Sequence, residues 1–352
     1  MKTTHDIKRG VSLYSYQDHY YFKKYTLEDC IAAAAGCDAE GIEIMPEMMI
    51  PSWPYVSDDF VARWNGWMER YDITPAVLTH FADRAMHKFK NLTDDEVYER
   101  SVLYIKMAAK LGCHWIRLMH SYHGGKDELS PYDLVNPKIA ERLIPVAEDY
   151  DVVMAMECHA PTSIDDPVQQ EFVEVAEKHN TKHLALQIDM STCESRPSIA
   201  AFNWMNRRGV SEKTTDFLRG LYDEINAGEK VDWDLVEKTC AANGDVFTDD
   251  GDKAVIFNFI IKGHRPPTPP EVVKQYASKL AYVHAKFHYA EEDGTIENID
   301  YPTYIKALKD GGYKGYINSE FEGNRMLNDL GDVDEVEFVR RQHVLLKKCL
   351  GY

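Results

Sequence analysis

The chain has 352 residues, of which 44% are hydrophobic and 28% are charged, and its formal net charge is −18. This length suits one large α/β barrel or two ordinary domains. The negative charge argues against nucleic acid and anionic membranes as partners, because both are bound through basic surfaces. Seven cysteines without a CxxC pair argue against a disulfide framework.

Apolar stretches rich in β-branched and aromatic residues alternate with amphipathic stretches along the chain. The pattern predicts strands at 11–16, 41–45, 73–81, 114–121, 152–159, 183–190, 282–288 and 316–323. It predicts helices at 27–37, 58–71, 93–112, 137–150, 168–179, 303–312 and 333–350. The helix at 93–112 has clear limits, since Thr93 and acidic residues open it and a glycine closes it.

The alternation breaks between residues 192 and 280. This segment has helical patterns near 212–226 and 233–243 and a proline-rich loop at 265–271. Eight strand–helix units in order are typical of a (β/α)₈ TIM barrel, whereas a doubly wound open sheet needs fewer strands. We therefore predict a single barrel domain over 1–352, with 192–280 as an insertion that enlarges the connection between strands six and seven.

Polar residues at the ends of the predicted strands are the candidates for chemistry, because reactive groups of such barrels lie at the carboxyl ends of strands. They are Glu157 and His159 in strand five, Gln187 and Asp189 in strand six, His284, Lys286 and His288 in strand seven, and Asn318, Glu320 and Glu322 in strand eight. Residues two apart on a strand project to the same face. Four neighbouring strands can thus direct a Glu, an Asp, a His and a second Glu at one point.

Three carboxylates around one imidazole would repel one another without a cation. This ligand set suits a divalent ion, and we expect Mn²⁺ first, with Mg²⁺, Co²⁺ or Zn²⁺ as alternatives. Each residue also has a simpler role open to it. Glu157 could be a salt-bridge partner, Asp189 a helix cap, His284 a core histidine and Glu320 a partner of an arginine. Their convergence on consecutive strands, at a common strand depth, favours the shared metal site.

The strand ends ECH (157–159), QID (187–189), HAK (284–286) and SEFEG (319–323) resemble those of the xylose-isomerase-like barrels. That group includes sugar isomerases, ketose 3-epimerases, inosose dehydratases and the family 2 AP endonucleases. The resemblance covers nearly the whole chain, and it implies Glu157, Asp189, His284 and Glu320 as the metal ligands.

Two departures from this pattern are informative. Thr192 stands where ketose epimerases usually carry a histidine, and Ser163 stands where they carry a second acidic residue. The AP endonucleases hold three metals with many more histidines and need a basic face for DNA, which the charge of −18 does not offer.

The chain is more similar to the α subunits of C-glycoside deglycosidases. These look like the same barrel with an enlarged strand-six connection, and they keep a histidine at the position of His159. The resemblance implies a small β subunit as partner in a hetero-oligomer. It also implies, as substrates, aryl C-glycosides already oxidised at C3 of the sugar.

The implied reaction removes the C2 proton of the 3-oxo sugar and then eliminates the aglycone from C1. The metal would act as a Lewis acid. His159 is expected to be the base, or the acid that protonates the departing carbon, unless it only orients Glu157. Lys286 would steady the enolate oxygen or form a salt bridge at the barrel mouth. The expected catalytic residues are His159, Glu157, Glu320 and Lys286.

Further residues are expected around the substrate: His120, Gln187, His288 and Arg196. Arg196 could instead pair with Glu194.

His80 and His120 are expected to point at the same barrel mouth, where either could contact sugar hydroxyls or cap a loop. Glu43 could reach the rim of this mouth. Trp204, Phe257 and Phe259 could stack on a flat aglycone, although aromatic residues also form ordinary core.

Two other functions stay open. One is a sugar isomerase or 3-epimerase that uses the same metal and an enediolate. The other is a binding barrel that has lost catalysis. The N-terminus has no apolar segment of the kind found in signal peptides, and no apolar run reaches the ~20 residues of a membrane span. The cysteine pattern, which argues against disulfides, favours a reducing cytoplasm, so we expect a cytoplasmic protein.

Overall fold

In a computed structural model, the chain forms a closed barrel in which the strands follow one another in sequence order, all parallel. The structure describes residues 5–80, 90–119, 135–247 and 256–352. The strands are β1 (Ile7–Ser12), β2 (Gly41–Ile44), β3 (Thr74–His80), β4 (Trp115–Leu118), β5 (Val153–Cys158), β6 (Leu184–Asp189), β7 (Leu280–Phe287) and β8 (Gly315–Phe321). The predicted (β/α)₈ barrel is confirmed.

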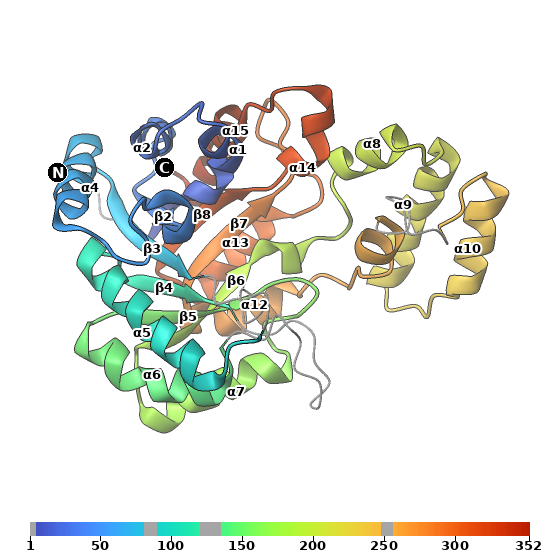
Figure 1. Cartoon of the computed structure of the whole chain (residues 1–352). Coiled ribbons are helices and arrows are strands. Elements are labelled where there is room, and N and C mark those ends of the chain that lie inside the picture. Colours follow the sequence, from blue (N-terminus) through green and yellow to red (C-terminus); the bar gives the residue numbers. More distant parts are fainter. Residues whose placement is uncertain (1–4, 81–89, 120–134, 248–255) are drawn as a thin grey trace.

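Helices follow the strands and lie around the barrel (Figure 1). They include α2 (Leu27–Gly36), α4 (Asp58–Tyr71), α5 (Asp94–Leu111), α6 (Pro137–Asp149), α7 (Pro167–His179), α12 (Pro270–Tyr276), α13 (Tyr301–Asp310) and α15 (Glu335–Leu350). Helix α5 begins where the sequence predicts. The Thr93 hydroxyl accepts from the Glu96 amide while the Glu96 carboxylate accepts from the Thr93 amide, and Gly112 ends the helix with φ 74°.

The first strand differs from its prediction at 11–16. Strand β1 begins at Ile7 and ends at Ser12, and Leu13–Tyr16 form the short helix η1. Gly10 of β1 lies against Asn318 of β8, because a Cβ on Gly10 would lie 2.0 Å from the Asn318 Oδ1 atom. A strand that carries charged residues and needs a glycine lacks the apolar pattern on which the prediction depended.

Alternate residues of β5 belong to two different clusters. Met154, Met156 and Cys158 pack in the main core, which joins the strands to the surrounding helices. Val153 and Ala155 pack in a second cluster together with residues of β3, β7 and β8. Glu157 continues the row of Val153 and Ala155, so the strand period directs it into the barrel.

The connection from β6 to β7 contains α8 (Ile199–Arg207), α9 (Glu212–Asn226), α10 (Trp233–Ala242) and a π-helix (Ile256–Ile261) before α12. These segments have a hydrophobic cluster of their own. Figure 1 shows α8, α9 and α10 beside the barrel, at the right of the view. That 192–280 is an insertion into a single domain stays a prediction.

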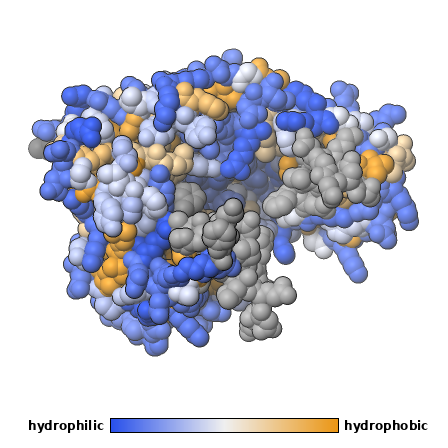
Figure 2. All heavy atoms as spheres, in the orientation of Figure 1, coloured by the Kyte–Doolittle hydropathy of each residue, from blue (hydrophilic) through white to orange (hydrophobic). Residues whose placement is uncertain are grey.

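The outer face in the view of Figure 2 is mostly hydrophilic, with hydrophobic residues scattered over it. None of the helices in the described part of the chain combines the length and the apolar character that a membrane span requires.

Candidate metal centre and active site

The four predicted ligands lie on four consecutive strands, at or near their carboxyl ends. In the strand register Glu157 pairs with Gln187, Asp189 pairs with His284, and Lys286 pairs with Glu320. The ligands therefore lie at different register positions along β5 to β8. The sequence suggested a common strand depth, and that expectation is wrong. Strands of a closed barrel tilt, so this difference in register brings the side chains to one level.

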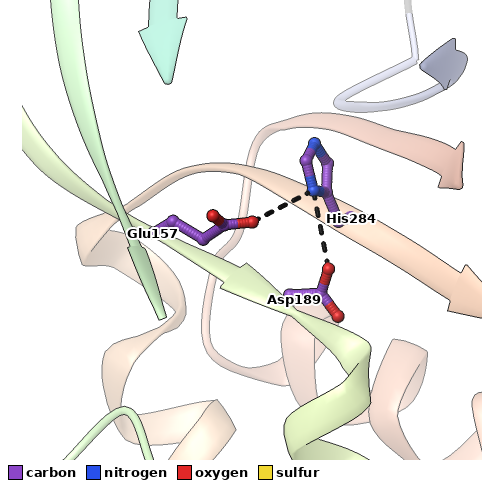
Figure 3. Close-up of side chains that lie close together, drawn as sticks. All are labelled: Glu157, Asp189 and His284. Atoms are coloured by element: carbon purple, nitrogen blue, oxygen red, sulfur yellow. Dashed lines mark ion pairs between the residues drawn. The ribbon is translucent and has the colours of Figure 1, made fainter. Parts of the chain in front are cut away.

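The carboxylates gather around one nitrogen of His284. Its Nδ1 atom lies 3.6 Å from the Glu157 Oε1 atom, 3.6 Å from the Asp189 Oδ2 atom and 3.3 Å from the Glu320 Oε2 atom. Figure 3 shows Glu157 and Asp189 pointing at the same side of the imidazole ring. The structure thus brings together all four residues that the sequence selected as ligands.

The other nitrogen of His284 is held by Glu43, at the end of β2. The His284 Nε2–H group donates to the Glu43 Oε2 atom at 2.7 Å, and both side chains are fully buried. Asn318 Nδ2 donates to the same carboxylate oxygen at 3.3 Å, and the Thr79 hydroxyl donates to the Oε1 atom. This bonding fixes the ring so that Nδ1 presents its lone pair to the other carboxylates.

Nearby positive charges favour the ionised form of three carboxylates in the cluster. Burial alone would raise the pKa of Glu157, but the Arg117 guanidinium lowers it below its usual range. Burial opposes ionisation of Asp189 in the same way, and Lys286 lowers its pKa below the usual range. His284 and Lys286 overcome the effect of burial on Glu320 and lower its pKa to about 2.

The residues present fit a bound divalent cation. Ligand atoms of Glu157, Asp189 and His284 all lie within 4.8 Å of one another. The Asp189 Oδ2 and His284 Nδ1 atoms are buried and have no hydrogen bond within the described part of the chain. Buried polar atoms that lack a hydrogen bond are costly, and a shared cation would satisfy both atoms while offsetting the excess of carboxylates. Oxygen and imidazole ligands suit Mn²⁺, Mg²⁺, Co²⁺ or Zn²⁺.

Lys286 is buried beside the cluster as a permanent cation. Its Nζ atom lies 2.7 Å from Glu320, 3.2 Å from Glu322 and 3.5 Å from Asp189. Burial would lower the pKa of Lys286, but Asp189 and Glu320 raise it well above its usual range. Lys286 can therefore stabilise negative charge but cannot serve as a base near neutral pH.

A cavity of about 890 Å³ opens beside the cluster, and Glu157, Glu320 and Lys286 are among its lining residues. His159 also lines this cavity and is only partly buried. Its Nδ1–H group donates to the Ala160 carbonyl at 2.7 Å, so Nε2 carries the lone pair. Cys158 lies in the outer core, where its Sγ atom is 3.6 Å from the Thr162 Oγ1 atom.

The four candidate substrate contacts have different positions. His288 lines the cavity, and its Nδ1 atom lies 3.2 Å from a Glu194 carboxylate oxygen. Gln187 is fully buried at the register level of Glu157, and it is not among the described lining residues. Arg196 is not among them either, and no ion pair joins it to Glu194 in the described structure. His120 lies outside the described residues.

The expected orientation of His80 is wrong, and for two of the aromatic residues the structure agrees with the ordinary-core alternative. His80 does not face the barrel mouth, because its ring stacks on Tyr104 of α5 with centroids 3.8 Å apart, and Thr79 faces the interior instead. Trp204 and Phe257 pack in the cluster of the β6–β7 connection and do not line the cavity. The side chain of Phe259 lies outside the described structure.

Arg117 of β4 is a site residue that the sequence argument missed. Its NH1 group donates to the Glu157 Oε1 atom at 3.0 Å, and both side chains are buried. Arg117 also lines the cavity. The signal was available, because a charged residue in the apolar segment WIRL, at the carboxyl half of a strand, fits the rule that selected the other candidates.

Comparisons with known proteins agree with the barrel fold. The family model described as xylose isomerase-like TIM barrel matches residues 31–342. The C-glycoside deglycosidase alpha subunit of Arthrobacter globiformis is 28% identical over 345 residues, which cover 98% of this chain and 92% of that protein. The 3'-dehydrocarminate deglycosidase alpha subunit of a Microbacterium species is 27% identical, with 97% of this chain and 95% of that protein covered.

Among solved structures, a D-psicose 3-epimerase determined in the presence of D-fructose superposes with a TM-score of 0.56. The sequence identity is 12%, and the match covers 98% of this chain and 100% of the epimerase chain. At this identity the similarity shows a shared fold.

Proposed function

Because the chain belongs to the xylose isomerase-like TIM barrel family, we propose that it is the catalytic α subunit of a C–C lyase that cleaves 3-oxo-C-glycosides. One observation carries the proposal. A single cavity joins the carboxylate–histidine cluster to His159 and Lys286, in a chain similar over nearly its full length to two deglycosidase α subunits. Their names support a partner subunit, which we take to be a small β subunit.

Glu157, Asp189, His284 and Glu320 would hold a divalent metal, for which Mn²⁺ is our first choice. A cation bound there would polarise the 3-oxo group of the sugar and so lower the pKa of the C2 proton. Glu43 holds the His284 ring in the orientation that this binding needs.

His159 takes the C2 proton on its Nε2 atom, because its Nδ1–H group is bound to the Ala160 carbonyl. The C2–H electron pair moves to the 3-oxo oxygen, where the Lys286 ammonium stabilises the developing charge. When that pair returns, a C1–C2 double bond forms and the C1–aglycone bond breaks. The aglycone carbon leaves with the bonding pair and takes up the proton from the His159 imidazolium, which restores the base. The products are an unsaturated 3-oxo sugar and the free aglycone.

The test is aglycone release from a 3-oxo-C-glucoside by the chain purified with its partner subunit. His159→Gln should lower kcat by about 10²- to 10⁴-fold, the usual contribution of a positioned base, while metal content stays the same. His114→Gln is the matched control, since His114 lies just before β4, at the opposite end of the barrel from the cavity.

A His159→Gln enzyme with unchanged kcat would remove His159 from the reaction. The alternative function is a metal-dependent sugar isomerase or 3-epimerase, whose reaction begins with the same proton abstraction. Epimerisation of a free ketose by the chain alone, without aglycone release in the presence of the partner, would favour that alternative.

A further inference from the structure

The cavity has two chemically different linings. Charged side chains of the barrel, among them Glu157, Lys286 and Glu320, line one part. Apolar side chains line another part: Ala201 of α8, Pro197 just before this helix, Ile260 of the π-helix and Pro266 just after it. At about 890 Å³ the cavity is near the upper end of the range, ~300–1,000 Å³, of pockets that enclose drug-sized molecules. It is larger than one sugar ring requires, and the apolar lining suits an aromatic group.

One polar side chain of this apolar lining, His264, is held in a fixed orientation. The Asn226 Nδ2 group donates to the Ser195 carbonyl at 2.7 Å, so the Asn226 Oδ1 atom must accept. It lies 3.0 Å from the His264 Nε2 atom, which therefore carries the proton. The Tyr222 ring packs edge-on against the imidazole, with centroids 4.8 Å apart and an interplanar angle of 86°.

This bonding fixes the tautomer of His264. With the proton on Nε2, the Nδ1 atom is a hydrogen-bond acceptor. Nδ1 has no hydrogen bond in the described structure and is not among its buried unsatisfied atoms, and His264 lines the cavity, so Nδ1 is the ring nitrogen available to a ligand there. Burial lowers the pKa of His264 to about 4, which keeps the ring neutral near pH 7.

We propose that His264 is a specificity-determining residue that selects a planar aromatic ligand bearing a hydroxyl group, whose O–H donates to Nδ1. That this aromatic group is the aglycone of the substrate rests on the proposed function. The recognition of a hydroxylated ring by a neutral, pre-oriented imidazole does not rest on it.

The probe is umbelliferone, a planar phenol, compared with its methyl ether, which has no O–H donor. Calorimetry on the full chain measures the two dissociation constants without any turnover. The wild-type protein should bind the phenol about 3- to 10-fold more tightly, the usual worth of one neutral hydrogen bond. His264→Phe keeps an aromatic ring against Tyr222 and removes the acceptor, so its preference should fall to about 1-fold.

A second variant keeps the proposal testable if His264→Phe does not fold. In Asn226→Asp a carboxylate accepts from Nε2–H and favours the protonated ring, so Nδ1 becomes a donor. The preference for the phenol over its ether should then fall below that of the wild type. His114→Phe, at the far end of the barrel, should keep the wild-type preference.

Equal affinity of the wild type for phenol and ether would overturn the proposal. An unchanged preference in a folded His264→Phe or Asn226→Asp protein would do the same. If the wild type prefers the phenol as expected but releases no aglycone from a 3-oxo-C-glucoside, the proposed function fails and the binding role of His264 stands.

Discussion

At the scale of single residues, the orientation of His284 determines what the cluster can bind. Its ring lies between Glu43 on one side and three carboxylates on the other. Glu320 and Glu43 raise the pKa of His284 well above its usual range, against the effect of burial. The surrounding carboxylates therefore stabilise a positive charge near the Nδ1 atom. A divalent cation bound there would supply this charge while the imidazole stays neutral.

Glu43→Gln tests this orientation. The neutral amide removes the charge that holds the Nε2 proton, so we expect divalent metal affinity to fall by about 10- to 100-fold. Competition against a fluorescent chelator measures it. Glu40→Gln is the control, because Glu40 lies just before β2 and contacts the Arg9 amide at 3.4 Å. Equal affinities in Glu43→Gln and wild type would show that Glu43 does not orient the ligand.

Part of this site could be predicted from the sequence. Strand parity selected Glu157, Asp189, His284 and Glu320, because each ends or nearly ends a clear apolar run. Strand parity placed His80 on the wrong face, because strands of a parallel barrel are apolar on both sides and polar and apolar residues alternate only weakly along them. The contact between Glu43 and His284 joins residues 241 apart in sequence, and no local pattern reports it.

At the scale of elements, the closing helix α15 is tied to β1 through a buried polar pair. Arg9 NH1 donates to the His343 Nδ1 atom at 3.1 Å and to the Cys37 carbonyl at 3.2 Å. His343 is buried, and both burial and the Arg9 charge lower its pKa to about 3. The first and last elements of the barrel thus meet around a histidine that stays neutral.

This pair predicts sensitivity to acid. An unfolded chain binds a proton on His343 near pH 6.5, whereas the folded chain does so only near pH 3. The free energy of unfolding therefore falls as the pH falls through this window, by up to about 1.4 kcal/mol per pH unit. In His343→Asn the amide oxygen can still accept from Arg9, but the titrating imidazole is gone. The free energy of unfolding of this variant should therefore fall less steeply below about pH 6.5.

Urea unfolding at several pH values measures the two slopes. His179→Asn is the control, since His179 lies on the exposed surface of α7 and pairs with Glu141. Identical slopes for His343→Asn and wild type would contradict the prediction.

Element boundaries show where prediction from sequence ends. Helix α5 was predicted correctly because its capping residues are local. Strand β1 was misplaced because its residues are explained by partners far along the chain: Gly10 by Asn318 and Arg9 by His343. A local sequence pattern carries no information about contacts between residues so far apart in the chain.

At the scale of the whole molecule, the candidate metal site joins four strands of the barrel wall, so an ion bound there should stabilise the fold. A ligand at 100 times its Kd stabilises the folded state by about 2.7 kcal/mol. We expect Mn²⁺ added to metal-stripped protein to raise Tm by on the order of 5 °C. Calorimetry or fluorescence melting measures the shift. Asp189→Asn should abolish most of it, and an equal shift in that variant would place the bound ion elsewhere.

The cavity lies where two separately packed cores meet, one in the barrel and one in the β6–β7 connection. Arg207 of α8 fastens the two, because its guanidinium donates twice to Asp329 at 2.9 Å and once to the Met326 carbonyl at 2.6 Å. A ligand that contacts both linings would add further contacts between the barrel and the connection to those that Arg207 makes. The bound ligand would therefore affect how tightly the connection is held against the barrel. Substitutions in the connection can change the shape of the cavity without changing the candidate metal ligands.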